Sequence, residues 1–393
     1  MLNKWHEEVE EVYEQMVARR RHLHENPELP FQEVQTARMV GDILAGYGIE
    51  IQRNVGGHGV VGILKGGNPG PTIALRADMD ALPIQQENDV PYKSQVPNVM
   101  HACGHDAHTA TLLGVAKILS NYQDQLHGTV KFIFQPAEEQ WPGGAIQMIE
   151  EGVLEGVDVI FGNHLLSSVQ LGNFTVPKGS ATASSDYVEI KITGKGGHSS
   201  APHTSVNPIV IGAQIVNQIH LLMSQKVDPV QPVVAAITMF NAGVAINVIP
   251  EVATIAGTVR TFNEEQRENV RMYLTHILTN VTVTYGATYE LEYKRGYPPL
   301  ENTDKEVDVV RELLANIDHL NVVEMLPIMA SEDFSYYLQK VPGVYFYTGS
   351  ATDDPNTQFP HHHAKFNIDE RAMKNSAKGF LSIVDYYLVP EDI

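Results

Sequence analysis

The fold of this chain is decided by the stretch GTVKFIFQPAEE, residues 128–139. Its first seven residues are almost continuously apolar, which is typical of a strand that is buried on both faces of a sheet. Further strands are expected at residues 59–65, 72–76, 157–162 and 343–348, with helical patterns between them. This alternation predicts an α/β fold in which a mostly parallel sheet is covered by helices.

Polar side chains follow several of these strands. They are Asp78, Asp80, Glu138, Glu139 and His164. In parallel sheets of this kind, ligands bind beyond the carboxyl ends of the strands. We therefore expect these side chains to lie close together at one edge of the sheet.

The stretch MHACGHDAHT, residues 100–109, contains the only cysteine of the chain and precedes an apolar run that predicts a buried helix. Thiolate, imidazole and carboxylate groups bind zinc-like metals, and Cys103 and His105 can point to the same side of a turn. A buried cysteine alone is more often a small core residue. The acidic and imidazole groups downstream favour a metal site instead.

The candidate ligands outnumber the four of a structural zinc site. They are Cys103, His105, Glu139, His164 and one histidine of residues 361–363. Such a set can hold two divalent ions if one ligand bridges them. Because Glu138 and Glu139 are adjacent, one can bind metal while the other acts on the attacking water as a general base.

The pattern changes near residue 185. The expected order from there to residue 296 is β-α-β-β-α-β, which is that of a ferredoxin-like domain, with a helix at 264–278 and a strand at 281–293. The predicted domains are therefore a metal-binding domain, residues 1–184 and 297–393, and an inserted α+β domain, residues 185–296.

Composition excludes several classes of protein. A chain of 393 residues favours two domains, and its net charge of -20 argues against nucleic acid as a partner. No apolar run approaches about 18 residues, and the acidic N-terminus is unlike a secretory signal, so no membrane association is expected. A single cysteine excludes an internal disulfide and fits the reducing cytoplasm. The run Arg19–Arg21 is interpreted as a solvated helix face.

Six motifs together give the chain a recognisable pattern. They are RxxHxxPEL (21–29), RADMDALP (76–83), CGHDAH (103–108), FQPAEE (134–139), GGHSSxPH (196–203) and SEDF (331–334). With them the chain resembles, nearly end to end, the amidohydrolase branch of the zinc aminoacylase and carboxypeptidase G family. That branch includes hippurate hydrolase, N-acetyldiaminopimelate deacetylase and the plant indoleacetyl-amino-acid hydrolases.

The resemblance implies a set of metal ligands and two further carboxylates. The ligands are Cys103, His105, Glu139, His164 and a C-terminal histidine. Aligned on Phe366 this histidine is His362, but Ala364 stands where the family has proline, and His361 remains an alternative. Glu138 falls on the general base of the family. Asp80, rather than Asp78, falls on the carboxylate that orients the metal site.

The resemblance also implies that the inserted domain is a lid over the substrate and mediates homodimers. His198 would stabilise the oxyanion, Asn247 would contact substrate, and Arg260 would hold a substrate carboxylate. His198 and Arg260 can serve either their own site or that of the neighbouring subunit. Asp106 and His108 are expected to orient ligands rather than bind metal.

The sequence thus predicts a cytoplasmic metal-dependent amidohydrolase that cleaves N-acyl (acetyl, benzoyl or similar) amino acids or small peptides, with Glu138 as general base. Its two divalent ions would be zinc, manganese, cobalt or nickel. One alternative is a non-catalytic metal- or ligand-binding relative, and another is a dimeric interaction protein with a vestigial site. The presence of Glu138 and of a complete ligand set favours the enzyme.

Overall fold

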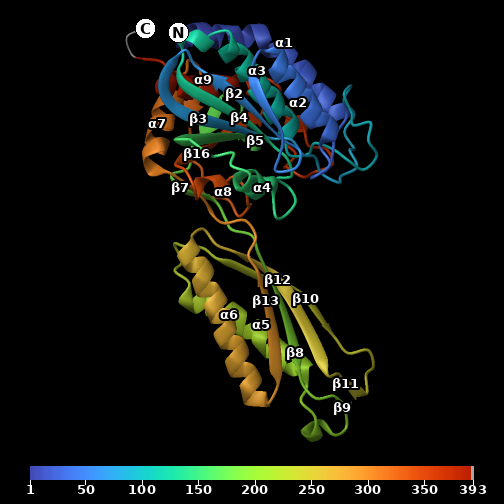
Figure 1. Ribbon diagram of the computed structural model, residues 1–393. Helices are drawn as coiled ribbons and strands as arrows, with labels where there is room; N and C mark the ends of the chain where they lie inside the picture. The colour runs from blue at the N-terminus through green and yellow to red at the C-terminus, as the bar shows by residue number, and fades with distance from the viewer. Residues whose placement is uncertain (391–393) are drawn as a thin grey trace. The chain divides into compact units, whose positions relative to one another are not determined.

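The computed structural model describes residues 1–390, and the chain folds into two compact units (Figure 1). The larger unit contains Met1–Gly179, Asn302–Leu326 and residues 333–390. The second, which we call the inserted unit, contains Ser180–Glu301 and Pro327–Glu332. The predicted insertion at 185–296 lies within the inserted unit.

The larger unit is built on an eight-stranded sheet. In spatial order its strands are β1 (Glu50–Val55), β2 (Gly59–Lys65), β4 (His127–Gln135), β3 (Asn68–Asp78), β5 (Val159–Gln170), β16 (Gly343–Ala351), β6 (Asn173–Thr175) and β15 (Asn321–Val322). The four central strands β4, β3, β5 and β16 pair in parallel, which confirms the predicted sheet. The predicted strand β2 pairs antiparallel with β1 and with β4, and β6 pairs antiparallel with β16 and parallel with β15. Strands β1, β6 and β15 were not predicted.

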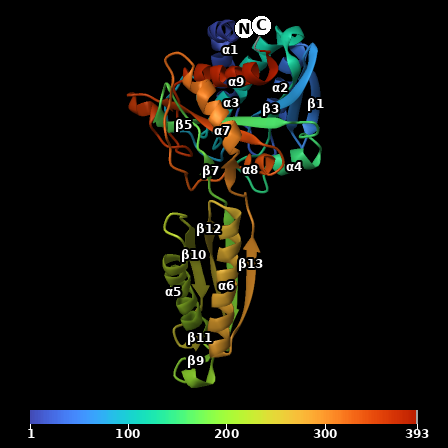
Figure 2. The same cartoon turned by 90° about the vertical axis from the view of Figure 1, so that its left-hand side faces the viewer.

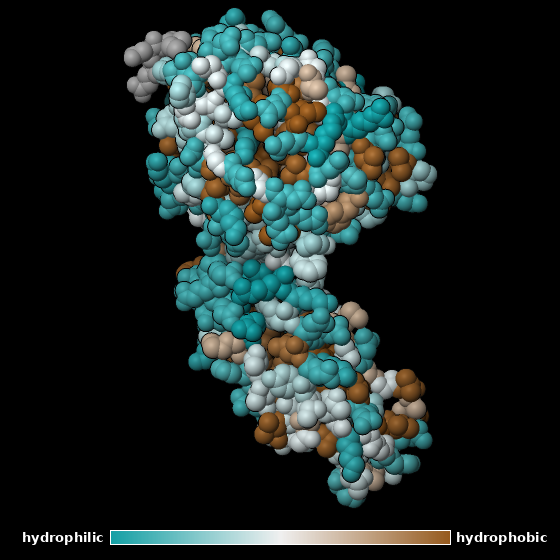
Figure 3. All heavy atoms as spheres, viewed as in Figure 1, coloured by the Kyte–Doolittle hydropathy of each residue, from teal (hydrophilic) through white to brown (hydrophobic). Residues whose placement is uncertain are grey.

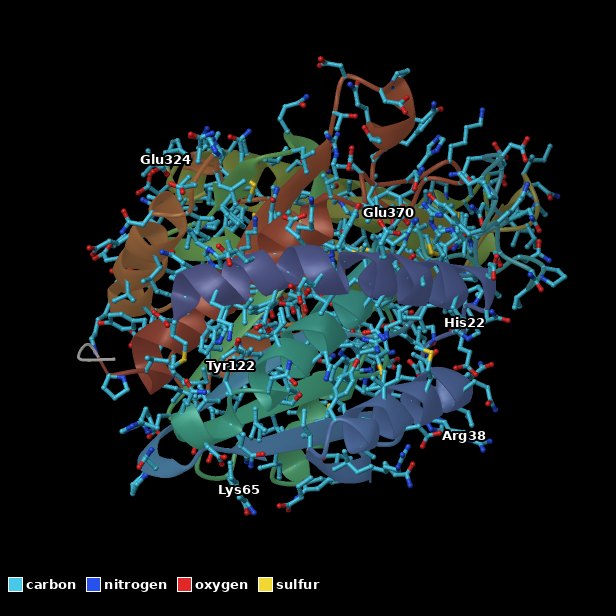
Figure 4. All side chains as sticks on the ribbon, turned by 90° about the horizontal axis from the view of Figure 1, so that it is seen from above. His22, Arg38, Lys65, Tyr122, Glu324 and Glu370 are labelled. Atoms are coloured by element: carbon cyan, nitrogen blue, oxygen red, sulfur yellow. The ribbon has the colours of Figure 1, made fainter. Side chains whose placement is uncertain are left out.

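Helices cover this sheet. They are α1 (Leu2–Glu25), α2 (Val34–Gly46), α3 (His105–Ser120), α4 (Gly144–Glu150), α7 (Asp304–Ala315), α8 (Ser335–Leu338) and α9 (Ala372–Leu388). Nearly every residue of α3 is buried, because α3 packs between the sheet, α1 and α9 (Figure 4). Among the helices of residues 1–390, none combines the length and apolarity needed to cross a bilayer.

The inserted unit has the predicted β-α-β-β-α-β order. Its elements are β8 (Asp186–Thr193), α5 (Pro208–Lys226), β10 (Val234–Ala242), β12 (Val252–Arg260), α6 (Glu264–Tyr285) and β13 (Thr288–Lys294). The strands form an antiparallel sheet in the order β10-β12-β8-β13, and α5 and α6 share a core with it (Figures 1 and 2). This arrangement is the ferredoxin-like one.

Short elements connect these parts. They are the paired strands β9 (Gly197–His198) and β11 (Val248–Ile249), the paired strands β7 (Gly179–Thr182) and β14 (Leu300–Asn302), and the 3-10 turns η1 (Gln123–Gln125), η2 (Pro202–Thr204) and η3 (Pro355–Thr357).

Two predicted boundaries are wrong. Residues 281–285 are not strand, because α6 continues to Tyr285 and ends at Gly286, which has a left-handed φ of 71°. Their β-branched side chains suggested a strand, yet Val281 and Thr282 lie on the buried face of the helix. Strand β5 does not end before His164 but runs through it to Gln170.

Candidate active site

Side chains of ligand type converge in the larger unit at the turn that leads into α3. This turn contains Cys103 and Gly104, and α3 begins at His105. Gly104 has a φ of 99°, a left-handed conformation that glycine adopts without a clash. Ligand atoms of Cys103, His105 and Glu139 lie within 4.8 Å of one another. The structure thus brings together three residues that were predicted to bind metal.

The ring of His105 is oriented by Asp80. Its Nδ1 lies 3.0 Å from the backbone oxygen of Asp80 and 3.2 Å from the Asp80 carboxylate. Both are acceptors, so Nδ1 carries the proton of the neutral ring and Nε2 presents a lone pair. Nε2 is buried and makes no hydrogen bond within the described chain. This is the geometry expected of a histidine that binds metal.

The electrostatics around His105 suit a cation. Burial by itself lowers the pKa of His105, but the carboxylates of Asp78, Asp80 and Glu139 raise it to about 10. These groups therefore place an excess of negative charge around a buried ring nitrogen. A bound divalent cation would take the place of the second proton on this ring.

His164 and Cys103 face each other beside this ring. Nδ1 of His164 donates to the backbone oxygen of Leu165 at 2.7 Å, and its Nε2 lies 3.4 Å from Sγ of Cys103. Burial raises the pKa of the Cys103 thiol, and nearby carboxylates, that of Glu139 first, raise it further. A neighbouring cation would reverse this effect, because metal coordination stabilises the thiolate. The residues present therefore fit a divalent metal site.

His361 is buried close to these groups, but one of its ring nitrogens already accepts a hydrogen bond from the backbone. Its ligand atom lies within 4.8 Å of those of Cys103 and His164. However, its Nε2 accepts a hydrogen bond from the backbone N–H of Ser167 at 3.3 Å. The proton of the neutral ring must then sit on Nδ1, so neither nitrogen keeps a lone pair for a metal.

His362 presents its ring to Glu139 instead. Nε2 of His362 lies 3.0 Å from Oε1 of Glu139. The backbone N–H of His362 donates to the backbone oxygen of Ala102 at 2.8 Å, which fixes the segment beside the Cys103 turn. The hydrogen bonds of the two rings therefore favour His362 over His361 as the C-terminal ligand.

Glu138 and Glu139 lie in the loop that follows β4. Ala137, immediately before them, has a φ of 53°, which breaks the regular alternation of the strand. The backbone N–H of Glu139 donates to Oδ2 of Asp80 at 2.9 Å, and the Glu138 side chain is buried. Asp80 thus holds both His105 and the second glutamate, as expected for the orienting carboxylate.

A buried polar network that the sequence did not predict lies behind the ligands. Arg76 is buried, and its guanidinium donates to Asp78 at 2.5 Å, Asp333 at 3.0 Å and Gln135 at 2.8 Å. The carboxylate of Asp333 also accepts from the side chain of Gln135 and from the backbone of Ala145. A charged residue inside an otherwise apolar strand was the signal that could have identified Arg76.

His108 belongs to the same network and is not free to bind metal. Its Nδ1 lies 2.7 Å from Oδ1 of Asp78, and its Nε2 accepts from the backbone N–H of Leu165 at 3.0 Å. Both ring nitrogens are therefore engaged. Because Leu165 also accepts from His164, His108 links Asp78 to the strand segment that carries that predicted ligand.

Arg20 corrects the interpretation of the Arg19–Arg21 run as a solvated face. Arg20 is fully buried and donates to Asp106 at 2.9 Å, and it lies 3.2 Å from Glu370, which sits beside α1 (Figure 4). His24 also contacts Asp106, at 2.8 Å. Burial alone would raise the pKa of Asp106, but Arg20 and His24 hold it below its usual range. Asp106 thus fixes the first turn of α3 from behind.

The predicted residues of the inserted unit fall into two places within that unit. His198 in β9 is exposed, and the backbone N–H of Ser199 donates to the backbone oxygen of Asn247 at 3.1 Å, so His198 and Asn247 lie side by side. Arg260 is the last residue of β12, which starts next to β11. Val252 and Arg260, the two ends of β12, are eight residues apart, which corresponds to about 26 Å along a strand. Both views place β9 and β11 beyond the end of the sheet where β12 begins (Figures 1 and 2).

The tautomer of His198 is set by Ser200. The backbone N–H of Ser200 donates to Nδ1 of His198 at 3.1 Å. The neutral ring therefore carries its proton on Nε2, which leaves this atom as a hydrogen-bond donor.

The chain matches the model of one protein family and is similar to several known proteins along most of its length. The model of Peptidase family M20/M25/M40 matches residues 74–386. A thermostable carboxypeptidase 2 from Saccharolobus solfataricus is 42% identical over 380 residues, covering 96% of each chain. An N-acyl-L-amino acid amidohydrolase from Geobacillus stearothermophilus is 46% identical over 298 residues, covering 76% of this chain and 80% of that protein.

A solved structure is similar along nearly the whole chain. The crystal structure of the Bacillus subtilis YXEP protein, a dinuclear metal binding peptidase from the M20 family, matches with a TM-score of 0.85. The two chains are 35% identical, and the match covers 95% of this chain and 98% of the other.

Proposed function

Because this chain belongs to the M20/M25/M40 peptidase family, we propose that it hydrolyses the amide bond of N-acyl amino acids or small peptides. The chain is a hydrolase of amide bonds, as its amidohydrolase and carboxypeptidase relatives are. One observation carries the proposal. Ligand atoms of Cys103, His105 and Glu139 lie within 4.8 Å of one another, and the residue before Glu139 is the buried Glu138.

We assign two divalent cations to this site, as in the dinuclear B. subtilis protein. The proposed ligands are Cys103, His105, Glu139, His164 and His362. When bound, the ions would polarise the amide carbonyl and lower the pKa of a water molecule. The thiolate favours zinc, while imidazole and carboxylate ligands also admit manganese, cobalt or nickel.

The residues of the chain then have separate roles. Glu138 takes a proton from the attacking water and delivers it to the leaving nitrogen. Asp80 holds the His105 ring and the backbone of Glu139, and Asp78, paired with Arg76, holds His108. The proposed location is the cytoplasm, which the single unpaired cysteine supports and cell fractionation would check.

A substrate panel tests this function directly. The purified enzyme is expected to hydrolyse at least one of a set of N-acetyl amino acids, N-benzoyl amino acids and dipeptides, and to lose that activity with a chelator. Activity should return when zinc, manganese, cobalt or nickel is added back, and the ion that restores it identifies the metal. Hydrolysis that persists after the metal is removed would contradict the proposal.

The proposed roles of the inserted unit require two subunits. Arg260 would hold the substrate carboxylate and His198, through Nε2, the developing oxyanion. In one small substrate the carboxylate and the oxyanion that forms at the amide carbonyl are a few bonds apart. His198 and Arg260, however, lie toward opposite ends of the inserted unit. We therefore propose that each site takes one of the two residues from the neighbouring subunit.

A homodimer through the inserted unit is further supported by its surface. Strand β10 lies at the edge of the sheet, so its outer backbone groups are free to pair with another chain. Met239 and Phe240 on this strand and Val244 and Ile246 in the following loop are exposed. The brown atoms at the lower right of Figure 3 lie over this part of the unit.

Mixed dimers test the shared site. His198→Ala and Glu138→Gln homodimers should each lose most activity, His198→Ala by about 10²–10³-fold as for other oxyanion donors. If His198 serves the neighbouring site, re-associated mixtures should regain about a quarter of wild-type activity, since half of the dimers are mixed and each has one intact site. A mixture that stays inactive, while mass spectrometry shows mixed dimers, would place His198 in its own subunit's site.

A further inference from the structure

We infer that Glu33 is a positioning residue for Glu138, because its carboxyl group holds the left-handed turn at Ala137 that directs the two glutamates of the site. The inference rests on the proposed role of Glu138 as general base. It assigns a function to a residue that lies outside all six sequence motifs, more than a hundred positions before the loop that it contacts.

Glu33 reaches the loop from another part of the larger unit. It immediately precedes α2 and is fully buried, but its side chain does not cap that helix. Instead Oε1 accepts the backbone N–H of Ala137 at 2.8 Å and that of Phe31 at 3.0 Å. One carboxylate oxygen therefore joins the α2 entry loop to the loop that follows β4.

Both residues held by Glu33 are in an unusual conformation. Ala137 has a φ of 53° and Phe31 a φ of 62°, in the left-handed region that residues with a side chain seldom adopt. Such conformations persist where surrounding contacts fix them. Because the peptide plane at Ala137 sets the path of the chain into Glu138, fixing its N–H also fixes where Glu138 begins.

The neighbouring residues of the loop are held in the same way. The Gln135 side chain contacts Asp333, and the backbone N–H of Glu139 donates to Asp80. Glu33 thus supplies an anchor between these two, one residue before Glu138. Such control matters because a displacement of about 1 Å can cost about 10²-fold in rate.

The environment of Glu33 argues against a role in packing alone. Its second oxygen, Oε2, is buried and has no hydrogen-bond partner among residues 1–390. Burial, and then the nearby Asp80, raise the pKa of Glu33 to about 7. An apolar side chain would fill this volume without leaving a polar atom unpaired. What a carboxyl group adds over such a side chain is the hydrogen bond from the backbone N–H of Ala137.

Four variants test separately the length of the side chain at position 33, its charge, and the backbone strain at Ala137. Glu33→Ala should lower kcat by about 10–10²-fold with KM and metal content near wild type, because the turn is released while the ligands stay. Glu33→Gln keeps an acceptor at the same reach and should retain near wild-type kcat. Glu33→Asp keeps the charge but is one methylene shorter, so it should be impaired like alanine. Adding Ala137→Gly to Glu33→Ala should restore part of kcat, since glycine adopts the left-handed turn unaided.

The outcomes decide between roles. Wild-type kcat for Glu33→Ala, or an active Asp variant beside an inactive Gln variant, would overturn the inference. So would a loss of bound metal in the folded Glu33→Ala protein, or the absence of any rescue by Ala137→Gly. If Glu33→Ala does not fold, the Gln and Asp pair decides alone. Glu138→Gln serves as the reference: if that variant keeps full activity, the proposed function itself fails.

Discussion

Glutamine in place of Glu138 is expected to lower kcat by about 10²–10⁴-fold, the usual contribution of general acid–base catalysis. The amide keeps the size and shape of the side chain but cannot accept a proton from the attacking water. Metal content should stay near wild type, because Glu138 is not a proposed ligand. Substrate should still bind with similar affinity. Steady-state kinetics beside elemental analysis of the same preparation measures both quantities.

Glu139→Gln is the matched control, since it makes the same chemical change one residue further along. Glu139 lies within 4.8 Å of the ligand atoms of Cys103 and His105, so this variant should lose metal as well as activity. The two substitutions therefore differ in kind. Loss of metal from Glu138→Gln with retention in Glu139→Gln would reverse the assigned roles. Full turnover in both variants would contradict the catalytic interpretation of the loop.

Cys103→Ser is expected to lose most of the bound metal and, with it, most of the activity. Sγ of Cys103 lies 3.4 Å from Nε2 of His164 and within 4.8 Å of the ligand atoms of His105 and Glu139. A neutral hydroxyl at this position is a poorer ligand than a thiolate. Folding should be retained, because serine is slightly smaller and the site is polar. Elemental analysis and a thermal melt of the purified variant would check both points. Full metal content with wild-type turnover would remove Cys103 from the ligand set.

His361 and His362 provide a matched pair for the same measurement. His362→Ala should lose metal, because its Nε2 faces Glu139 at 3.0 Å. His361→Ala should keep the metal, because its Nε2 is occupied by the backbone N–H of Ser167. The opposite pattern would mean that His361 turns away from Ser167 when metal binds.

The sheet and the position of the site could be predicted because local sequence determines both. A continuous apolar run such as residues 128–134 is buried wherever it lies, and the polar residues that follow it must emerge at the end of the strand. The site side chains were found from residue type and motif, before any contact was known. Glu33 carried no such signal, because its function depends on a hydrogen bond to a loop far away in the chain.

Other features could not be predicted because they arise from contacts between distant segments. Whether His361 or His362 faces the ligands depends on backbone groups of Ser167 and Ala102. The run 281–285 has side chains that suit a strand, but Val281 packs into the core that α6 shares with the sheet of the inserted unit, which favours the helix. From the sequence alone Arg20 was interpreted as a surface residue, because its ion pair with Asp106 joins two helices that are distant in the chain.

The Arg76 network also bears on how the protein is made on the ribosome. Arg76 is neutralised by Asp78, two residues away, and by Asp333, which is synthesised after the whole antiparallel sheet of the inserted unit. A nascent chain can therefore complete that sheet at Lys294 while the guanidinium of Arg76 still lacks the Asp333 carboxylate. Breaking a buried ion pair costs about 3–5 kcal/mol. The ion pair between Arg76 and Asp333 can therefore form only late in translation, after residue 333 has left the ribosome.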